Sequence, residues 1–368
     1  VRELEGKDGI IACRFRAKLF YANAGERKFK IFFNEAGDAA RYITPSYFRD
    51  EALAIPGIFP SHGHHKYLNN GIDYKTFLEL EAMNFDWQWQ LMKKTWENHE
   101  VDITVVYSVY LDTINHQYRS IFEGLVPASD REFREAHQLY EDAYMLADEF
   151  LGKIIDFVDE ETTIVAVSDH GSMGYNTIIS PFTVLERAGL LAYNDTGVPG
   201  KKTVDWSRTL AYPVGTCHVY VNLKGRDPHG IVDERDYDMV VNRIIKVLQD
   251  GFRDDKKGIC ALAFALRREE AGLAGQGGEY CGDVVYGLAG TTIGGYYGGV
   301  HACQIPTART STGDMRALFV IAGPGFKKGE VISRCVHLYD AAPTLCYALG
   351  YPQPAHAEGR IVFDALNF

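Results

Sequence analysis

Five side chains of the types that bind metal ions lie next to apolar, strand-like runs of this sequence. They are Asp112, His116, Asp169, His170 and His301. The first pair follows the run 103–110, the second pair follows the run 163–168, and the last histidine precedes the run 317–322. Carboxylate oxygen and imidazole nitrogen are ligands for Zn²⁺ and Mn²⁺. Because ligands bind at the carboxyl edge of an open α/β sheet, the three groups could meet there and hold divalent metal ions.

Each group also has a simpler structural interpretation. Asp169 could cap a helix beside an exposed His170, and Asp112 with His116 could be a capping residue and a surface histidine. The chain has 12 histidines, so an Asp-x-x-x-His spacing is expected about once by chance. His301 could be an ordinary loop residue. The joint occurrence of the three groups beside apolar runs favours the metal site.

Hydrophobic periodicity predicts the elements that would position these residues. Strands are expected at 9–16, 28–33, 103–110, 163–168, 218–223 and 317–322, and helices at 74–99, 133–158, 236–250 and 339–349. The order strand, helix, strand between 103 and 168 predicts a parallel pair with a right-handed crossover.

The expected fold class is α/β, with a mainly parallel sheet flanked by helices and an inserted α+β subdomain. We expect a β-leaning and helical N-terminal segment at 1–100 and the inserted subdomain at 201–299. The remaining ranges, 101–200 and 300–368, are expected to form the α/β metal-binding core.

Composition limits the class of protein. The 368 residues are 46% hydrophobic and 12% aromatic, which argues for a globular chain. A formal net charge of -11 argues against duplex nucleic acid or an anionic membrane as the main partner. We see no apolar run of the roughly 18 residues that span a membrane. Seven dispersed cysteines without a C-x-x-C pair indicate a reduced set and predict a cytoplasmic location, with a signal upstream of Val1 left open.

The motifs together carry a family resemblance. Ser168-Asp169-His170-Gly171 after a β-branched run, an earlier Asp112-x-x-x-His116, and the stretch Gly323–Gly329 after a late histidine resemble the alkaline phosphatase superfamily. The closest branch is the type I phosphodiesterase/nucleotide pyrophosphatase group, which the segment Asp340–Leu345 also resembles. The motifs span about residues 101–368, and residues 1–100 resemble the group only loosely.

This resemblance implies an alkaline phosphatase-like fold and two divalent metal ions, Zn²⁺ first, with Mn²⁺ or Mg²⁺ as alternatives. Asp112, His116 and His301 match the ligands of one metal. Asp169 and His170 match part of the set for the other.

The family also has a further metal-binding Asp and a Thr or Ser nucleophile at a helix N-terminus, and we find neither. Hydroxyls occur in Thr44-Pro45-Ser46 and in Pro60-Ser61-His62-Gly63, but no metal-ligand strand precedes them. We interpret both as loop residues. The chain thus resembles the C-terminal portion of such an enzyme, without the part that carries the nucleophile.

The expected function is metal-dependent hydrolysis of phosphate esters or diesters, with a small phosphate ester or a nucleotide as substrate. The missing N-terminal portion or a second copy of the chain could be a partner. A sulfatase, a phosphonate hydrolase or a phosphoglycerate mutase of the same superfamily is an alternative. So is a non-catalytic binding subunit that keeps the metal frame without the nucleophile.

Overall fold

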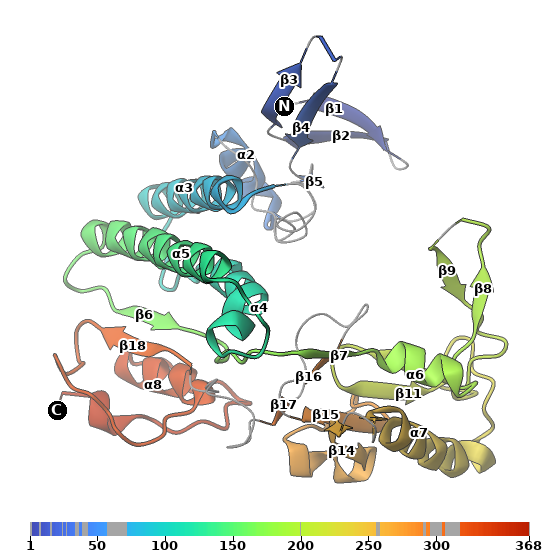
Figure 1. Ribbon diagram of the computed structural model, residues 1–368. Helices are drawn as coiled ribbons and strands as arrows, with labels where there is room; N and C mark the ends of the chain where they lie inside the picture. The colour runs from blue at the N-terminus through green and yellow to red at the C-terminus, as the bar shows by residue number, and fades with distance from the viewer. Residues whose placement is uncertain are drawn as a thin grey trace. The chain divides into compact units, whose positions relative to one another are not determined.

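A computed structural model describes most of the chain, and it divides into two compact units. The described residues are 2–6, 9–14, 17–23, 25–26, 28–33, 37–38, 43–56, 72–198, 200–254, 258–289, 292–294, 304–305 and 317–367. The first unit comprises 1–114, 129–169 and 318–368, and the second comprises 115–128 and 170–317 (Figure 1). Helix α4 (Tyr110–Phe122) contributes residues to both units.

The first unit contains two long helices, several shorter ones and small sheets. Its helices are α2 (Ser46–Ala54), α3 (Tyr74–Asn98), α5 (Asp130–Phe157), α8 (Ala341–Ala348) and the 3₁₀ turns η4 (Leu338–Asp340) and η5 (Phe363–Ala365). Its strands are β1 (Arg2–Gly6), β2 (Gly9–Arg14), β3 (Ala17–Asn23), β4 (Lys28–Phe33), β5 (Gly37–Asp38), β6 (Ile164–Val167) and β18 (Phe319–Ala322).

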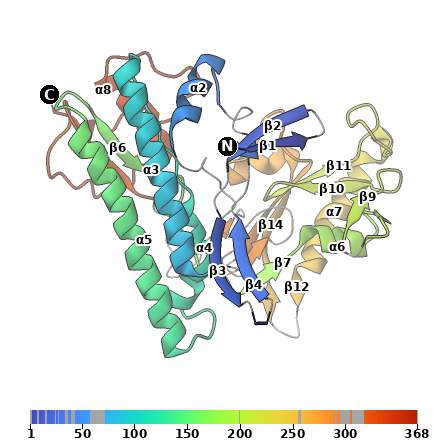
Figure 2. The ribbon, with the colours of Figure 1, turned by 90° about the horizontal axis from the view of Figure 1, so that it is seen from above.

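Helices α3 and α5 lie side by side (Figures 1 and 2). Their interface contains Phe85 and Phe150, whose stacked rings have centroids 4.4 Å apart. Asp73 caps α3 by accepting a hydrogen bond of 2.9 Å from the backbone N–H of Thr76. Ser129 and Glu132 form a capping box at the start of α5, so both helix beginnings have side-chain partners for backbone N–H groups.

The second unit is built around an antiparallel sheet with two helices packed on it. Its helices are α6 (Pro181–Arg187), α7 (Tyr237–Gly251), η2 (Glu234–Asp236) and η3 (Arg268–Ala274). Its longer strands are β10 (Ala211–Val214), β11 (His218–Val221), β14 (Leu262–Arg267) and β15 (Val284–Ala289), in the order β10-β11-β15-β14. The shorter strands are β7 (Thr177–Ile179), β8 (Tyr193–Asp195), β9 (Lys202–Val204), β12 (Arg253–Asp254), β13 (Ile259–Cys260), β16 (Thr292–Gly294) and β17 (Gln304–Ile305).

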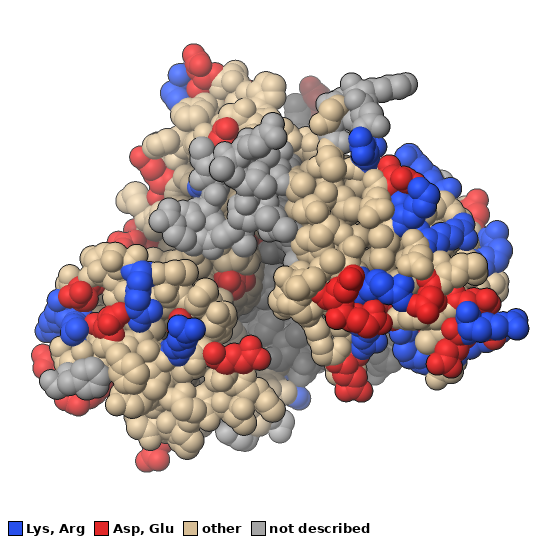
Figure 3. Space-filling model, turned by 90° about the horizontal axis from the view of Figure 1, so that it is seen from below, with Lys and Arg blue, Asp and Glu red and all other residues tan. Residues whose placement is uncertain are grey.

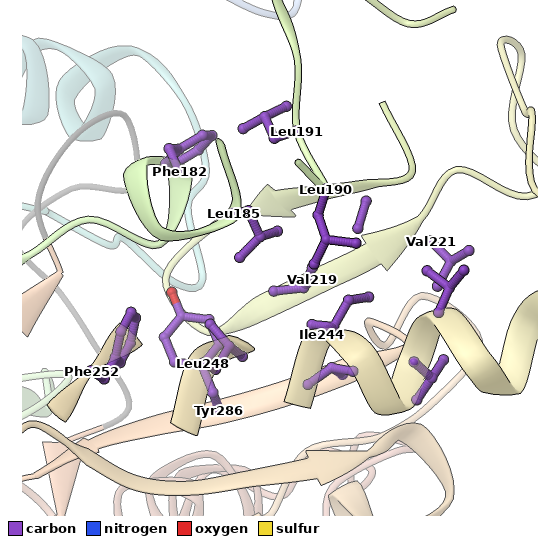
Figure 4. Packing of buried hydrophobic residues seen from close by; sticks show 14 of the residues in the cluster. Phe182, Leu185, Leu190, Leu191, Val219, Val221, Ile244, Leu248, Phe252 and Tyr286 are labelled. Atoms are coloured by element: carbon purple, nitrogen blue, oxygen red, sulfur yellow. The ribbon is translucent and has the colours of Figure 1, made fainter. Parts of the chain in front are cut away.

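The core of this unit lies between the sheet and helices α6 and α7. Leu185 of α6, Val219 of β11 and Ile244 of α7 belong to one buried cluster (Figure 4). Along β11 buried and half-buried residues alternate, as expected for a strand with one face on a core. Each fully buried aliphatic side chain contributes about 1.5–3 kcal/mol.

Two buried polar groups fix the loops of the second unit. The carboxylate of Asp283 is 1% exposed and accepts hydrogen bonds from the backbone N–H of Val221, the guanidinium of Arg226 and the hydroxyl of Tyr237. Asn222 is also buried, and its Nδ2 donates to carbonyl oxygens in three segments. These are Trp206 at 3.3 Å, Thr209 at 2.9 Å and His229 at 2.9 Å.

Most long elements expected from the sequence are confirmed, but the strand at 103–110 is wrong. Residues 103–109 lie in no helix or strand, Tyr110 begins α4, and the side chain of Val105 is 85% exposed. A β-branched run becomes a strand only when a neighbour takes its backbone hydrogen bonds. Strand β6 pairs with β18 in antiparallel orientation, so the expected parallel pair with 103–110 is wrong as well.

Other expectations have mixed outcomes. Among the described strand pairs, β7 with β16 and β15 with β17 are parallel and the others are antiparallel, so a mainly parallel sheet stays a prediction. The three-part domain division also stays a prediction. Ser46 is the first residue of α2, which corrects its interpretation as a loop residue, and Ser61 lies outside the described residues. In the part of the chain that the structure describes, we find no helix with the length and apolar character of a membrane span.

Candidate metal centre

Helix α4 carries the first two candidate ligands. Its first residue, Tyr110, is 2% exposed, lies edge-on to Phe85 at 5.2 Å, and donates from its hydroxyl to the carbonyl of Ala143. These contacts fix the start of the helix against α3 and α5. Asp112 lies in the first helical turn, where a carboxylate interacts favourably with the helix dipole. His116 follows one turn later on the same face, and its Nε2 atom is shielded from solvent.

The second half of α4 is bonded to the segment that follows His170. Ser120 accepts a hydrogen bond of 2.8 Å from the backbone N–H of Tyr175, and Glu123 accepts one of 3.0 Å from that of Gly174. A Cβ atom at position 174 would lie 2.9 Å from three atoms of Ser120, Glu123 and Leu125. The close approach therefore requires glycine, and it ties the segment after His170 to the helix that carries His116.

The end of β6 positions Asp169. Ser168 donates its backbone N–H to the carbonyl of Leu318 at 3.0 Å, and its Oγ accepts from the backbone N–H of Leu318 at 2.8 Å. These two bonds continue the pairing of β6 with β18 by one residue. Asp169 comes directly after the residue that makes these two hydrogen bonds, and it is exposed.

His170 has one ring nitrogen already engaged. Its Nδ1 lies 2.7 Å from the carbonyl oxygen of Gly171, and a carbonyl can only accept, so Nδ1 carries the proton. The lone pair of the neutral ring is then on Nε2. Metal-binding histidines usually donate their other ring N–H to a carbonyl or carboxylate in this way, so the residue fits a ligand role.

Asp112 and Asp169 both act on one phenol, that of Tyr107. Tyr107 is exposed as a whole. The slight desolvation of its hydroxyl raises the pKa, and the carboxylates of Asp169 and Asp112 raise it further. Two carboxylates from separate segments of the first unit therefore lie within electrostatic range of a single group. The sequence interpretation did not single out Tyr107, although an aromatic residue within the apolar run before Asp112 was an available signal.

On the face drawn in Figure 3, the described residues include side chains of both charges. Lys and Arg side chains there are interspersed with Asp and Glu. Like-signed carboxylates such as Asp112 and Asp169 repel an anionic substrate unless a cation lies between them. A bound metal ion is therefore the natural source of positive charge for such a substrate.

His301, the fifth candidate ligand, lies outside the described residues. Among the residues that are described, no group of three or more His, Cys, Asp or Glu side chains is arranged to hold a metal ion. The complete five-residue site, with its metal identity, therefore stays a prediction.

Comparison with known families gives a match over most of the chain. The profile described as type I phosphodiesterase/nucleotide pyrophosphatase matches residues 20–286. The matched stretch contains Asp112, His116, Asp169 and His170, and it ends before His301. It also begins well before residue 101, so the N-terminal part is closer to the family than the motifs alone indicated. No curated protein sequence matches the chain.

A solved structure is similar in fold. The crystal structure of wild-type alkaline phosphatase PafA aligns with a TM-score of 0.50 and 16% sequence identity, covering 84% of this chain. The alignment spans 57% of the length of PafA. At this identity the similarity concerns the fold alone, which is the α/β fold of alkaline phosphatase.

Proposed function

Because this chain belongs to the type I phosphodiesterase/nucleotide pyrophosphatase family, we propose that it hydrolyses phosphate esters or diesters with the help of divalent metal ions. The substrate class is a small phosphate ester or a nucleotide. The proposal includes the mainly parallel sheet of the alkaline phosphatase fold and a site formed by Asp112, His116, Asp169, His170 and His301.

The observation that carries the proposal is the family match over residues 20–286, which contains Asp112, His116, Asp169 and His170. A pair of carboxylates drawn from two segments supplies the hard oxygen ligands that divalent metals prefer. In this proposal Asp112, His116 and His301 hold one metal ion, while Asp169 and His170 contribute to a second. Zn²⁺ is the first choice because imidazole ligands suit it, with Mn²⁺ or Mg²⁺ as alternatives.

Bound metals would supply Lewis-acid stabilisation of the oxygens that carry charge in the reaction. The protein's own side chains do the rest. The Nδ1–H of His170 donates to the carbonyl of Gly171, which holds the ring in one orientation and assigns Nε2 to the ligand role in this proposal. Tyr107, whose pKa is raised further above its ordinary value of 10.0, supplies a neutral hydroxyl donor within electrostatic range of the two carboxylates.

The nucleophilic hydroxyl is proposed to come from a segment outside residues 1–368. Ser46, which begins α2, is not the nucleophile in this proposal. In this form the chain binds metal through its own residues and turns substrate over slowly. A binding subunit that keeps the metal frame, without catalysis, is the competing function.

Metal content and turnover on two substrates test the proposal. The purified chain is loaded with Zn²⁺, desalted and analysed by inductively coupled plasma mass spectrometry. Hydrolysis of bis(4-nitrophenyl) phosphate and 4-nitrophenyl phosphate is then measured. We expect retained zinc in the wild type, loss of at least one equivalent in Asp112→Asn and in His170→Gln, and faster turnover of the diester than of the monoester.

Asp148→Asn is the matched control, because Asp148 is an exposed carboxylate on α5 away from the proposed ligands in sequence. It should keep both the metal and the activity of the wild type. Zinc retention without any turnover, even after an N-terminal extension that supplies a hydroxyl, supports the binding subunit. No zinc retention by the wild type contradicts both functions.

A further inference from the structure

His218 holds a loop of the second unit through a ring nitrogen that acts as an acceptor. The loop joins η3 to β15 and contains Gly282, whose backbone N–H donates to Nδ1 of His218 at 3.2 Å. A backbone N–H can only donate, so Nδ1 carries no proton and the ring is the neutral tautomer with its proton on Nε2. In the imidazolium form both nitrogens carry protons, and this bond cannot exist.

The loop is packed tightly against the histidine. A Cβ atom at position 282 would lie 2.8 Å from Cβ of His218 and 3.2 Å from its Cα. Gly282 is buried, and His218 is half-buried in β11, between Val214 of β10 and Val285 of β15. Two donors facing each other at this distance repel, and Gly282 has no side chain that could move aside. Protonation therefore favours movement of the loop away from the strand.

Two buried thiols lie at this contact. Cys217 precedes His218, Cys281 precedes Gly282, and their exposed fractions are 5% and 3%. Both belong to a small cluster with Ala271 and Val285. Movement of the loop away from β11 would therefore expose a thiol that is otherwise inaccessible.

We propose that His218 is a pH-dependent latch, in which the neutral imidazole closes the loop onto β11 and protonation releases it and exposes Cys281. The release is limited at one end, because Asp283 is anchored to Arg226 and Tyr237. The hydroxyl of Tyr220 also donates to the carbonyl of Tyr280, and Arg268 holds the carbonyls of Gly278 and Glu279. The released part is therefore confined to about Cys281 and Gly282.

The charged and titratable groups around the latch come from β11 and the segment after it, from the loop, from helix α7 and from η3. They are Tyr220 on β11, Cys281 and Asp283 in the loop, Arg226 after β11, Tyr237 at the start of α7, and Arg268 of η3. Arg226 pairs with the carboxylate of Asp283, and Arg268 donates to the carbonyls of Gly278 and Glu279. Neither β10 nor β15 presents a charged residue opposite His218 in the strand register.

The direction of the pH effect follows from burial. Desolvation lowers the pKa of His218 below its ordinary value of 6.5. The open state, with a solvated ring, binds a proton at higher pH than the closed state. Closure is therefore complete above about pH 6.5 and weakens as the pH falls toward the lowered pKa. The opening equilibrium rises by at most about tenfold per pH unit in that window.

Thiol labelling measures the opening directly. The protein is treated with 4,4′-dithiodipyridine at pH 7.5, 6.5, 5.5 and 5.0, and each cysteine is followed by peptide mass spectrometry. Cys260 is exposed and serves as an internal standard for the pH dependence of the reagent. Cys346, half-buried in the first unit, reports unfolding of the rest of the chain. We expect the ratio of Cys281 to Cys260 labelling to rise as the pH falls below 6.5, while that of Cys346 stays level.

His218→Asn is the matched variant, because its amide oxygen can accept from Gly282 and does not titrate. It should label at the wild-type rate at pH 7.5 and show no rise at low pH. His218→Ala lacks an acceptor and should label faster at every pH. An unchanged Cys281 ratio in the wild type, a rise that persists in His218→Asn, or a parallel rise of Cys346 would each overturn the proposal.

Discussion

Ser168 and Leu318 exchange two hydrogen bonds across the ends of β6 and β18, with the backbone of Ser168 as donor in one and its hydroxyl as acceptor in the other. The hydroxyl takes the place of a backbone acceptor one residue beyond the last pair of the ladder. Asp169 follows immediately, so its position depends on the hydroxyl of the preceding residue.

Replacing Ser168 tests this dependence. Ser168→Ala removes the acceptor for the Leu318 N–H, at a cost of about 1 kcal/mol. The Leu318 amide should then exchange with deuterium about fivefold faster, as one such hydrogen bond predicts. Ser168→Thr keeps the hydroxyl and should exchange at the wild-type rate. Equal exchange in all three proteins would show that the hydroxyl does not hold this end of the sheet.

The ionisation of Tyr107 reports the two carboxylates beside it. Asp169→Asn should lower the pKa of the Tyr107 phenol more than Asp112→Asn does, because Asp169 is the larger of the two electrostatic causes. The ¹³Cζ chemical shift of labelled tyrosine measures this titration, and Tyr107→Phe assigns the signal. Asp102→Asn is the control, since Asp102 raises the pKa of Tyr351 instead. An unchanged pKa of Tyr107 in both Asn variants would contradict an electrostatic influence of the two carboxylates on this phenol.

The ion pair of Arg226 with Asp283 should contribute far more to stability than the exposed pair of Lys224 with Asp233. Arg226→Met removes the hydrogen-bonded cation of the buried carboxylate of Asp283 and leaves Arg268 at 4.0 Å. The loss costs about 3 kcal/mol, the lower end for a broken buried pair. The lower end applies because the side chain of Arg226 is 33% exposed. Lys224→Met in the same loop removes an exposed pair with Asp233 and should cost less than about 1 kcal/mol. Native-state amide exchange in β11 and β15 gives both values, and similar costs for the two variants contradict the account.

The cap of α3 should be sensitive to acid. Hydrogen bonds from the backbone and side chain of Thr76 lower the pKa of Asp73 below 3.8. A lowered pKa means that the stabilisation is present above pH 3.8 and is lost as the pH falls through the lowered value. Asp73→Asn keeps an acceptor without this titration, and Asp73→Ala costs about 1 kcal/mol at neutral pH. Amide exchange at Thr76 is measured between pH 5 and pH 3 and corrected for the intrinsic rate at each pH. Near pH 3, exchange should be slower in the Asn variant than in the wild type, and near pH 5 the two should agree.

Local sequence predicted the elements whose stability is local. Helices α3, α5 and α7 have an apolar stripe of helical period, and α3 and α5 also have capping residues, so their positions followed within a few residues. The strand at 103–110 was wrong because a strand depends on a neighbour that composition does not reveal. The pairing of β6 with β18 joins segments far apart in the chain, and no short-range pattern encodes it.

The candidate site was predictable only as a set of ligand types. Spacing singled out Asp112 and His116, but it said nothing of Tyr107, whose relevance depends on where Asp169 lies in space. Nothing in the sequence indicated that Gly174 is needed because Ser120 and Glu123 pack closely against its backbone. Such contacts arise from packing between segments, and a single sequence does not contain that information.

The side-chain amide of Asn222 makes the second unit sensitive to deamidation. Spontaneous deamidation would turn its NH₂ group into an oxygen of nearly the same size, and the three carbonyls that it now serves would face an anion. Conversion of Asn222 to Asp, although it hardly changes the size of the side chain, would thus remove the hydrogen bonds that hold the segments of Trp206, Thr209 and His229. Deamidation at this one nitrogen would therefore destabilise the second unit.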